Sequence, residues 1–275
     1  PTKYRETVEE GDQFLKDLIG ELDDSMAYHD YDYEFKFLIS GDRRQFNHEE
    51  DGEKFWNYFS ECLTEWTRHS YLQTYIVGID IAGAEVGGDL PQYVRKGIGK
   101  ILLKSGGRLK LTLHAGEQDN LESLEESLEM RPNRVGHALK LISDSNHYEF
   151  MKEHGISIEL CPTSNIEVHG YHRPLTKKGP KTPGKQPSYP LGEFLRNGMK
   201  ITISTDNPFI SRTNLGREYI EASLMTPGFL SQYQIIQFIF NSINESFLKM
   251  ESKKERMSEM NQMLKEYLRE YFKLN

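Results

Sequence analysis

The sequence contains few cysteines. Among its 275 residues there are only two, Cys62 and Cys161. They lie far apart, in apolar or helical-looking surroundings, so the sequence predicts neither a disulfide framework nor a zinc site built on cysteine. A reducing, cytoplasmic compartment fits this composition best.

Long apolar runs and an excess of positive charge are also missing. The densest apolar run, residues 235–240, is much shorter than the ~18 residues that cross a bilayer, so we expect no membrane attachment. Lys and Arg number 34 against 42 Asp and Glu, which leaves a net charge of −8. Such a chain repels phosphate backbones, so we also expect no nucleic-acid partner.

What the chain does contain is a regular alternation of short apolar runs and longer amphipathic segments. This pattern is typical of βα units around a parallel sheet. The expected strands are Glu34–Ser40, Thr74–Asp80, Leu109–His114, Arg134–His137, Ser157–Cys161 and Lys200–Thr205. The expected helices are Val8–Leu22, Glu49–His69, Leu90–Ser105, Leu121–Met130, Ser143–His154, Leu191–Asn197, Thr213–Ser223, Ser231–Ser242 and Glu245–Phe272.

No long polar linker interrupts this pattern. We therefore predict one α/β domain over residues 1–275, with a barrel or doubly wound sheet over about residues 1–210 and a helical part over about residues 211–275. The last helix either packs on a second copy of the chain, in a homo-oligomer, or covers the barrel. The sequence leaves both interpretations open.

Polar side chains follow the strands at their carboxyl ends, the edge at which parallel α/β folds build active sites. His114 and Glu117 follow one strand, His137 ends the next, and Asp206 follows the last. Any one of these residues alone can be explained by a structural role: a histidine can be a hydrogen-bonded loop residue, and an acidic residue can cap a helix. Together they suit a hydrolytic zinc site, in which imidazole and carboxylate bind the metal and a second carboxylate moves a proton.

Five ordered motifs resemble the adenosine/AMP deaminase family. They are Gly78–Glu85, His114–Glu117, Arg134–His137, Cys161–Asn165 and Ser204–Pro208. The resemblance runs from about Phe35 to Pro208. It implies a metal-dependent (β/α)₈ TIM-barrel fold, of which about six of the eight strands lie in this chain. It also implies a cytoplasmic hydrolase of purine nucleotide metabolism that replaces the C6 amino group of adenosine, AMP or ATP by water and releases ammonia.

The resemblance implies a role for each matching residue. His114 and Asp206 would bind Zn²⁺, Glu117 would protonate the purine N1, and His137 would orient the attacking water. The substrate-binding set would be Gly83 at N3, Asn207 at N7, and Asp80, which with Glu85 braces the loop around Gly83. Ser164 and Asn165 would brace the end of a later strand.

Two features depart from the family pattern. No His-x-His zinc-ligand pair precedes the strand at Phe35, so we expect an N-terminal segment or a partner chain to supply one; His29 and His48 are weaker candidates. Asn207 stands where the family usually has an aspartate, and its amide can still donate to N7. If the missing ligands are not replaced, the chain is a catalytically inactive nucleotide-binding or scaffold subunit. A different amidohydrolase is the other alternative.

The segment Arg173–Gln186 is basic and contains no acid. It follows a strand end, so it either overhangs the pocket and binds a substrate phosphate or forms a solvated surface loop. The candidate phosphate-binding residues are Arg43, Arg44, Arg173, Lys177 and Lys178.

Overall fold

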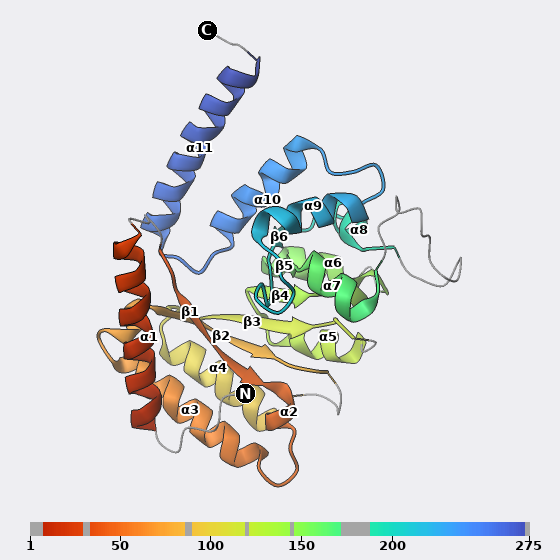
Figure 1. Cartoon of the computed structure of the whole chain (residues 1–275). Coiled ribbons are helices and arrows are strands. Elements are labelled where there is room, and N and C mark those ends of the chain that lie inside the picture. Colours follow the sequence, from red (N-terminus) through yellow and green to blue (C-terminus); the bar gives the residue numbers. More distant parts are fainter. Residues whose placement is uncertain are drawn as a thin grey trace. The chain divides into compact units, whose positions relative to one another are not determined.

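A computed structural model of the chain describes residues 8–29, 34–85, 90–118, 121–143, 146–171 and 188–272. Strands and helices alternate along these ranges (Figure 1). The elements up to residue 115 are α1 (Val8–Tyr28), β1 (Phe37–Asp42), α2 (Arg43–Phe46), α3 (Gly52–Arg68), the 3₁₀ turn η1 (Leu72–Thr74), β2 (Ile76–Ala82), α4 (Gln92–Lys104) and β3 (Lys110–Ala115).

The elements beyond residue 115 continue the alternation and end in consecutive helices. They are α5 (Leu121–Glu129), β4 (Arg134–His137), η2 (Leu139–Ser143), α6 (Asn146–His154), β5 (Ser157–Leu160), α7 (Pro162–His169), α8 (Leu191–Arg196), β6 (Ile201–Ile203), α9 (Leu215–Met225), α10 (Gln232–Asn244) and α11 (Met250–Phe272).

The strands follow one another in the sheet in the order of the sequence, from β1 to β6. The pairs β1–β2, β2–β3, β4–β5 and β5–β6 are parallel. The prediction of six parallel strands alternating with helices is therefore confirmed. Strand ends differ from the expected ones by up to three residues: β1 begins at Phe37 rather than Glu34, because its first partner on β2 is Ile76.

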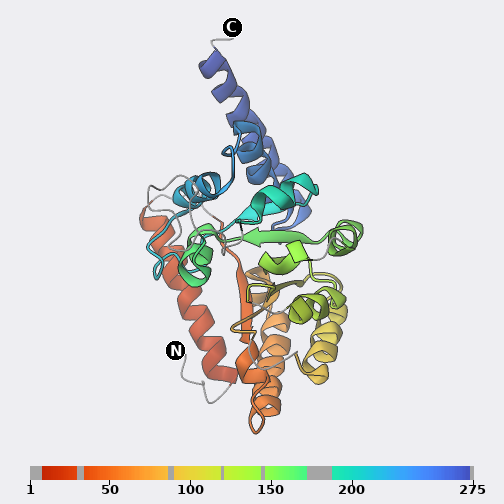
Figure 2. The same cartoon turned by 90° about the vertical axis from the view of Figure 1, so that its right-hand side faces the viewer.

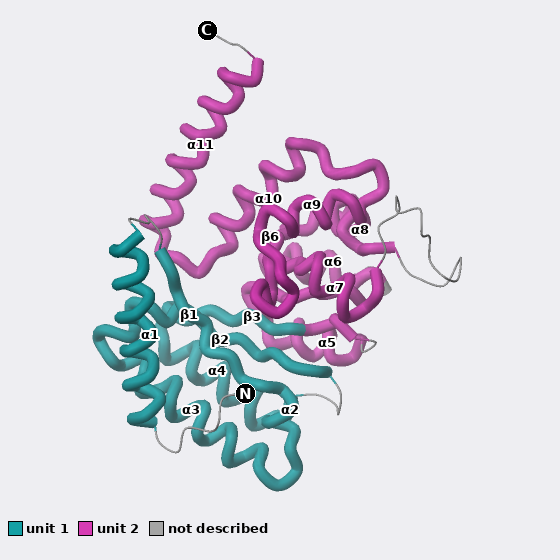
Figure 3. The backbone as a smooth tube through the Cα atoms, in the orientation of Figure 1, with its two compact units in different colours: residues 1–114 teal, residues 115–275 magenta. Residues whose placement is uncertain are grey.

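The chain divides into two compact units, residues 1–114 (unit 1) and residues 115–275 (unit 2), coloured separately in Figure 3. The division falls inside β3, so His114 belongs to unit 1 and Ala115 to unit 2. The single domain expected over residues 1–275 stays a prediction.

In unit 1 the register of the strands places polar residues side by side. Ser40 on β1 pairs with Asp80 on β2, and Asp80 pairs with Thr112 on β3. His114 lies two residues beyond Thr112 and therefore points to the same face of β3. Isoleucines 79 and 81, on either side of Asp80, are fully buried, which fixes that strand in the core.

Unit 2 has one apolar core. It is formed by side chains from β4, β5, β6 and the helices α5, α6, α8, α9 and α10, and includes Val135, Ile158, Ile201, Phe194 and Phe238. The helix α11 contributes no buried residue to it. Figures 1 and 2 show α11, the dark blue helix at the C-terminus, extending away from α10.

Three differences from the expected helices bear on the site. The last helix begins at Met250 rather than Glu245, and the sequence did not indicate the short helices α2 and α7. In the described ranges, no helix is long and apolar enough to cross a membrane.

Candidate active site

His114 is held by a carboxylate in unit 1. Its Nδ1 lies 3.0 Å from Oδ1 of Asp80, and Oδ2 of Asp80 accepts a hydrogen bond of 2.9 Å from the Ser40 hydroxyl. Because an ionised carboxylate can only accept, this contact places a proton on Nδ1 of His114, and in the neutral imidazole Nε2 then keeps a lone pair. This carboxylate–imidazole arrangement is typical of histidines that bind a metal through Nε2.

Arg43 and Arg44 differ in their surroundings. Arg43 is buried, and its Nη2 donates to the backbone carbonyl of His114 at 2.9 Å. Arg44 is exposed, and its Nη2 lies 2.7 Å from Oδ2 of Asp42. The hydrogen bonds from Arg44 lower the pKa of the Asp42 carboxyl. Arg43 thus supports the end of β3, while only Arg44 presents its charge at the surface.

Gly83 occupies a backbone conformation that requires glycine. Its φ is +95°, and a Cβ at this position would lie 2.5 Å from Oδ1 of Asp42. The absence of a side chain therefore lets the chain after β2 pass close to the Asp42 carboxylate.

In unit 2, His137 is buried and its ring is oriented by a hydrogen-bond chain. The Asn165 amide nitrogen Nδ2 lies 3.0 Å from His137 Nδ1, and the Tyr189 hydroxyl donates to Asn165 Oδ1 at 3.1 Å. Burial raises the pKa of Tyr189 well above its usual value, so the phenol stays protonated and acts as the donor. Asn165 must then donate to His137 Nδ1, which leaves the proton of the neutral imidazole on Nε2.

Glu117 lies between two histidines. Its Oε1 is 3.7 Å from Nε2 of His137 and 3.3 Å from Nε2 of His169. The sequence motifs indicated Glu117 and His137 but not His169. The missed signal is local: Pro162 at the first turn of α7 and Gly170 just after its last residue bracket a short helix that ends at His169.

A buried carboxylate ties α7 to the segment after β6. Glu218 on α9 is fully buried; its Oε2 accepts a 2.9 Å hydrogen bond from the backbone nitrogen of Thr163, and its Oε1 accepts one from the Thr213 hydroxyl. Glu218 therefore holds the first turn of α7 to the end of the segment that leads from β6 to α9.

Asp206 and Asn207 lie at the exposed end of β6. Asp206 has φ +55°, in the left-handed region, and accepts a 3.0 Å hydrogen bond from Nδ2 of Asn207 on its Oδ1. His137 and Ala138 also have left-handed backbones, with φ of 62° and 51°. Such conformations are costly for residues other than glycine and are found often at functional sites.

The donor chemistry fits zinc in part. His114, with Nδ1 bound to Asp80, and the carboxylate of Asp206 are ligand types that zinc takes. Among the described residues, however, no three His, Cys, Asp or Glu side chains gather as a metal cluster. Burial raises the pKa of the Cys161 thiol well above its usual value, so without a metal this thiol stays protonated.

Several predicted residues lie elsewhere or outside the description. Arg173, Lys177 and Lys178 are outside the described residues. His48 accepts a backbone hydrogen bond from Asp51 through Nδ1, as a turn residue does.

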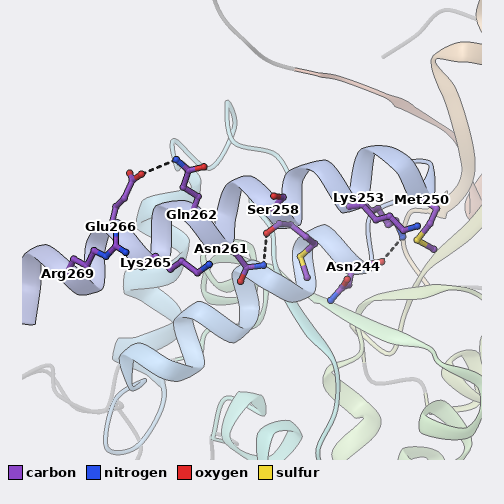
Figure 4. A pocket seen from close by; sticks show the side chains of 11 residues that line it. Asn244, Met250, Lys253, Ser258, Asn261, Gln262, Lys265, Glu266 and Arg269 are labelled. Carbon is purple, nitrogen blue, oxygen red and sulfur yellow. Dashed lines mark hydrogen bonds between the residues drawn. The ribbon is translucent and has the colours of Figure 1, made fainter. Parts of the chain in front are cut away.

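A cavity of about 930 Å³ lies along α11, lined among others by Lys253, Asn261 and Lys265 (Figure 4). None of the predicted site residues lines it.

The comparisons with solved structures concern the fold. The apo N6-methyl-AMP deaminase of Arabidopsis thaliana has a TM-score of 0.62 at 21% identity, over 82% of this chain and 58% of that chain. A Burkholderia ambifaria amidohydrolase with bound zinc has a TM-score of 0.64 at 19% identity, over 85% of this chain and 58% of that chain. These likenesses concern the fold alone, and they agree with the predicted α/β, TIM-barrel-like fold with six parallel strands in this chain.

The sequence comparisons are more specific. The adenosine deaminase of Enterococcus faecalis is 30% identical over 186 residues, which are 68% of this chain and 50% of the relative. The adenosine deaminase of Serratia proteamaculans is 32% identical over 154 residues, which are 54% of this chain and 40% of the relative. The chain thus spans about half the length of the curated relatives it matches. The sequence model of the adenosine deaminase family matches residues 59–263, most of the chain. The protein therefore belongs to the adenosine deaminase family.

Proposed function

We propose that this chain carries the adenine-deaminating centre of a zinc-dependent aminohydrolase, which converts a purine nucleoside or nucleotide to its inosine product and ammonia. Membership of the family supports this activity. The observation that carries the proposal is the position of Glu117 beside Nε2 of a buried histidine, His137, whose Nδ1 is already bound by Asn165.

The reaction exchanges the C6 amino group for oxygen. The oxygen of water bonds to C6 as the bond from C6 to the amino nitrogen breaks; one proton of the water replaces the proton that N1 takes from Glu117, and the other leaves with the amino group as ammonia. A carboxylic acid at Glu117 donates to N1 and makes C6 electrophilic. The Nε2–H of His137 donates a hydrogen bond to the oxygen of the attacking water and stabilises the charge that develops there. Asn165 and Tyr189 act by keeping His137 in this tautomer.

We propose zinc as the cofactor, with His114 and Asp206 as ligands and the remaining ligands supplied by an N-terminal segment or a partner chain. When bound, the metal acts as a Lewis acid that makes water nucleophilic near neutral pH. Asp80 then orients His114 rather than contacting the substrate, because both of its oxygens are engaged. Gly83 and Asn207 remain the proposed purine contacts.

The substrate's phosphate is a separate question. A solved Arabidopsis structure of this fold holds IMP, which is consistent with a nucleotide substrate for the present chain. Arg43 is committed to the His114 carbonyl. We therefore assign phosphate binding to Arg44, Arg173, Lys177 and Lys178. When Arg173, Lys177 and Lys178 are changed to Ser, we expect the turnover of AMP to fall more than the turnover of adenosine. Equal losses would remove them from this role.

The test is a paired assay on the chain purified together with the N-terminal segment or partner chain that supplies the remaining ligands: zinc stoichiometry, and the absorbance change from adenine to hypoxanthine with adenosine, AMP and ATP. We expect zinc and deamination of one substrate, with Glu117→Gln keeping zinc and losing several orders of magnitude in turnover. Glu122→Gln, an exposed change on α5, is the control. Zinc without deamination would favour another amidohydrolase. Neither zinc nor deamination would favour an inactive nucleotide-binding subunit.

We also place this activity in a reducing, cytoplasmic compartment. Cys62 and Cys161 are both buried and neither forms a disulfide, so the fold makes no use of an oxidising environment.

A further inference from the structure

His169 has a ring nitrogen that is buried beside the proposed catalytic acid. Its Nε2 lies 3.3 Å from Oε1 of Glu117, and both side chains are only 20% exposed. This nitrogen has no hydrogen bond of good geometry to any described residue. Leaving a buried polar atom without such a bond is costly, so this placement calls for an explanation.

The position of His169 is fixed by the ends of α7. Glu218 binds the backbone of Thr163 in the first turn, and Gly170 closes the helix with φ 67°, its nitrogen donating to the Ile166 carbonyl at 2.9 Å. His169 is the last helical residue before this turn. Its imidazole is therefore presented to Glu117 by a helix that is held at both ends.

Both imidazoles approach the same carboxylate oxygen. Nε2 of His137 lies 3.7 Å and Nε2 of His169 lies 3.3 Å from Oε1 of Glu117. A carboxylic acid has one oxygen that accepts and one that carries the proton. A donor at Oε1, where His169 is the nearer of the two, therefore favours a proton on Oε2. Hydrogen bonds of this kind are often long or poorly aligned before substrate binds.

We propose that His169 is a positioning residue for Glu117: it holds Oε1, so that Oε2 carries the proton and faces the purine ring nitrogen, while the Nε2–H of His137 serves the attacking water. This role rests on the proposed deaminase function. His169 does not touch the substrate, and it acts by preventing the carboxyl group from rotating and presenting its other oxygen.

The kinetic test uses two substitutions at this position. His169→Leu removes both ring nitrogens, whereas His169→Gln can place an amide N–H near the position of Nε2. We expect His169→Leu to lower kcat about 10- to 100-fold with little change in KM, as a misplaced catalytic group does. His169→Gln should recover most of the loss. An unchanged kcat in His169→Leu, or equal losses in both variants, would overturn the proposal.

The chain offers a matched control. His154 is also the last residue of a helix, α6, and is also followed by a left-handed glycine, Gly155 with φ 67°. It is exposed, and its Nδ1 bonds the Phe150 carbonyl rather than a carboxylate. His154→Gln and His154→Leu should therefore leave kcat and KM unchanged.

A second measurement needs no turnover. In the ¹⁵N-histidine-labelled chain, which has nine histidines, Glu117→Gln should shift the Nε2 resonances of His169 and His137 and leave those of His154 in place. His169→Gln and His154→Gln assign the signals. If the resonance of His169 does not respond, the pairing is refuted even in an active enzyme. If it responds in a chain that deaminates nothing, the pairing stands and the proposed function fails.

Discussion

Oδ1 of Asp80 lies 3.0 Å from Nδ1 of His114, across two neighbouring parallel strands. The strand register produces this contact, because Asp80 pairs with Thr112 and His114 projects from the same face two residues later. The second oxygen of Asp80 is held by Ser40. The imidazole is thus oriented by the sheet itself and not by a loop, which provides the rigidity that the proposed metal-binding role of His114 requires.

Changing Asp80 to Asn should weaken zinc binding about 10- to 100-fold, the usual cost of losing such a partner. The amide lacks the negative charge that supports the Nδ1 proton of His114. The measurement is a zinc titration with a competing chelator, alongside thermal unfolding of the metal-free chain. Ser40→Ala, which leaves the carboxylate in place, should have a smaller effect. Equal zinc affinity in parent and Asp80→Asn would remove His114 from the ligand set.

Replacing Tyr189 by Phe should lower kcat and also lower stability by about 1 kcal/mol, because Asn165 loses the donor that fixes its orientation. The control is Tyr148→Phe in the same core. The Tyr148 hydroxyl is buried without a hydrogen-bond partner among the described residues. Its removal should therefore leave kcat unchanged and be neutral or stabilising. The two variants are compared by steady-state kinetics and chemical denaturation; identical kinetics would refute the Tyr189–Asn165–His137 chain.

Gly83→Ala should destabilise the chain by about 1–3 kcal/mol. Alanine would carry a strained φ of +95°, and its Cβ would meet Asp42 Oδ1 at 2.5 Å. Gly99→Ala in α4 meets nothing within 4 Å and should stabilise by about 0.5–1 kcal/mol. Denaturant midpoints check both. A Gly83→Ala variant as stable as the parent would show that the loop after β2 can rearrange.

The Asp42–Arg44 ion pair should make the stability of the fold depend on pH in the acid range. Arg44 lowers the pKa of Asp42 in the folded chain, so the folded state binds this proton less readily than the unfolded state. The stabilisation is therefore present above the unfolded value of about 3.9 and is lost as pH falls through the folded pKa. Melting temperatures of the parent and Asp42→Asn should differ at pH 7, and the gap should narrow in acid and in high salt. A gap independent of pH would contradict the pairing.

The strands could be predicted, and the proposed site residues located at their ends, because each leaves a local pattern in the sequence. A buried apolar run followed by His114 or His137 marks a strand end directly. His169 could not be found in this way, because α7 has eight residues and its polar and apolar positions show little helical periodicity. Its partner, Glu117, lies 52 positions earlier, and only the packed fold of unit 2 brings the two together.

Arg43 shows a second limit of prediction from the sequence. Two arginines in succession after a strand usually indicate an exposed basic surface. Here the side chain of Asp42 caps α2 by accepting from the Arg44 nitrogen, and Arg43 is buried with its guanidinium on the His114 carbonyl while Arg44 remains outside. Two like residues thus have opposite environments because of one helix cap, which a charge pattern alone does not reveal.

The left-handed backbones at His137, Ala138 and Asp206 restrict how this sequence can diverge. Glycine, asparagine and aspartate adopt such a backbone with the least conformational strain, while the β-branched residues valine, isoleucine and threonine are strained the most. At residues 137 and 206 the chemistry narrows the choice further. Position 138 has no proposed role in the chemistry, but Ala138 is fully buried in the core of unit 2, so relatives should have small residues there and exclude β-branched ones.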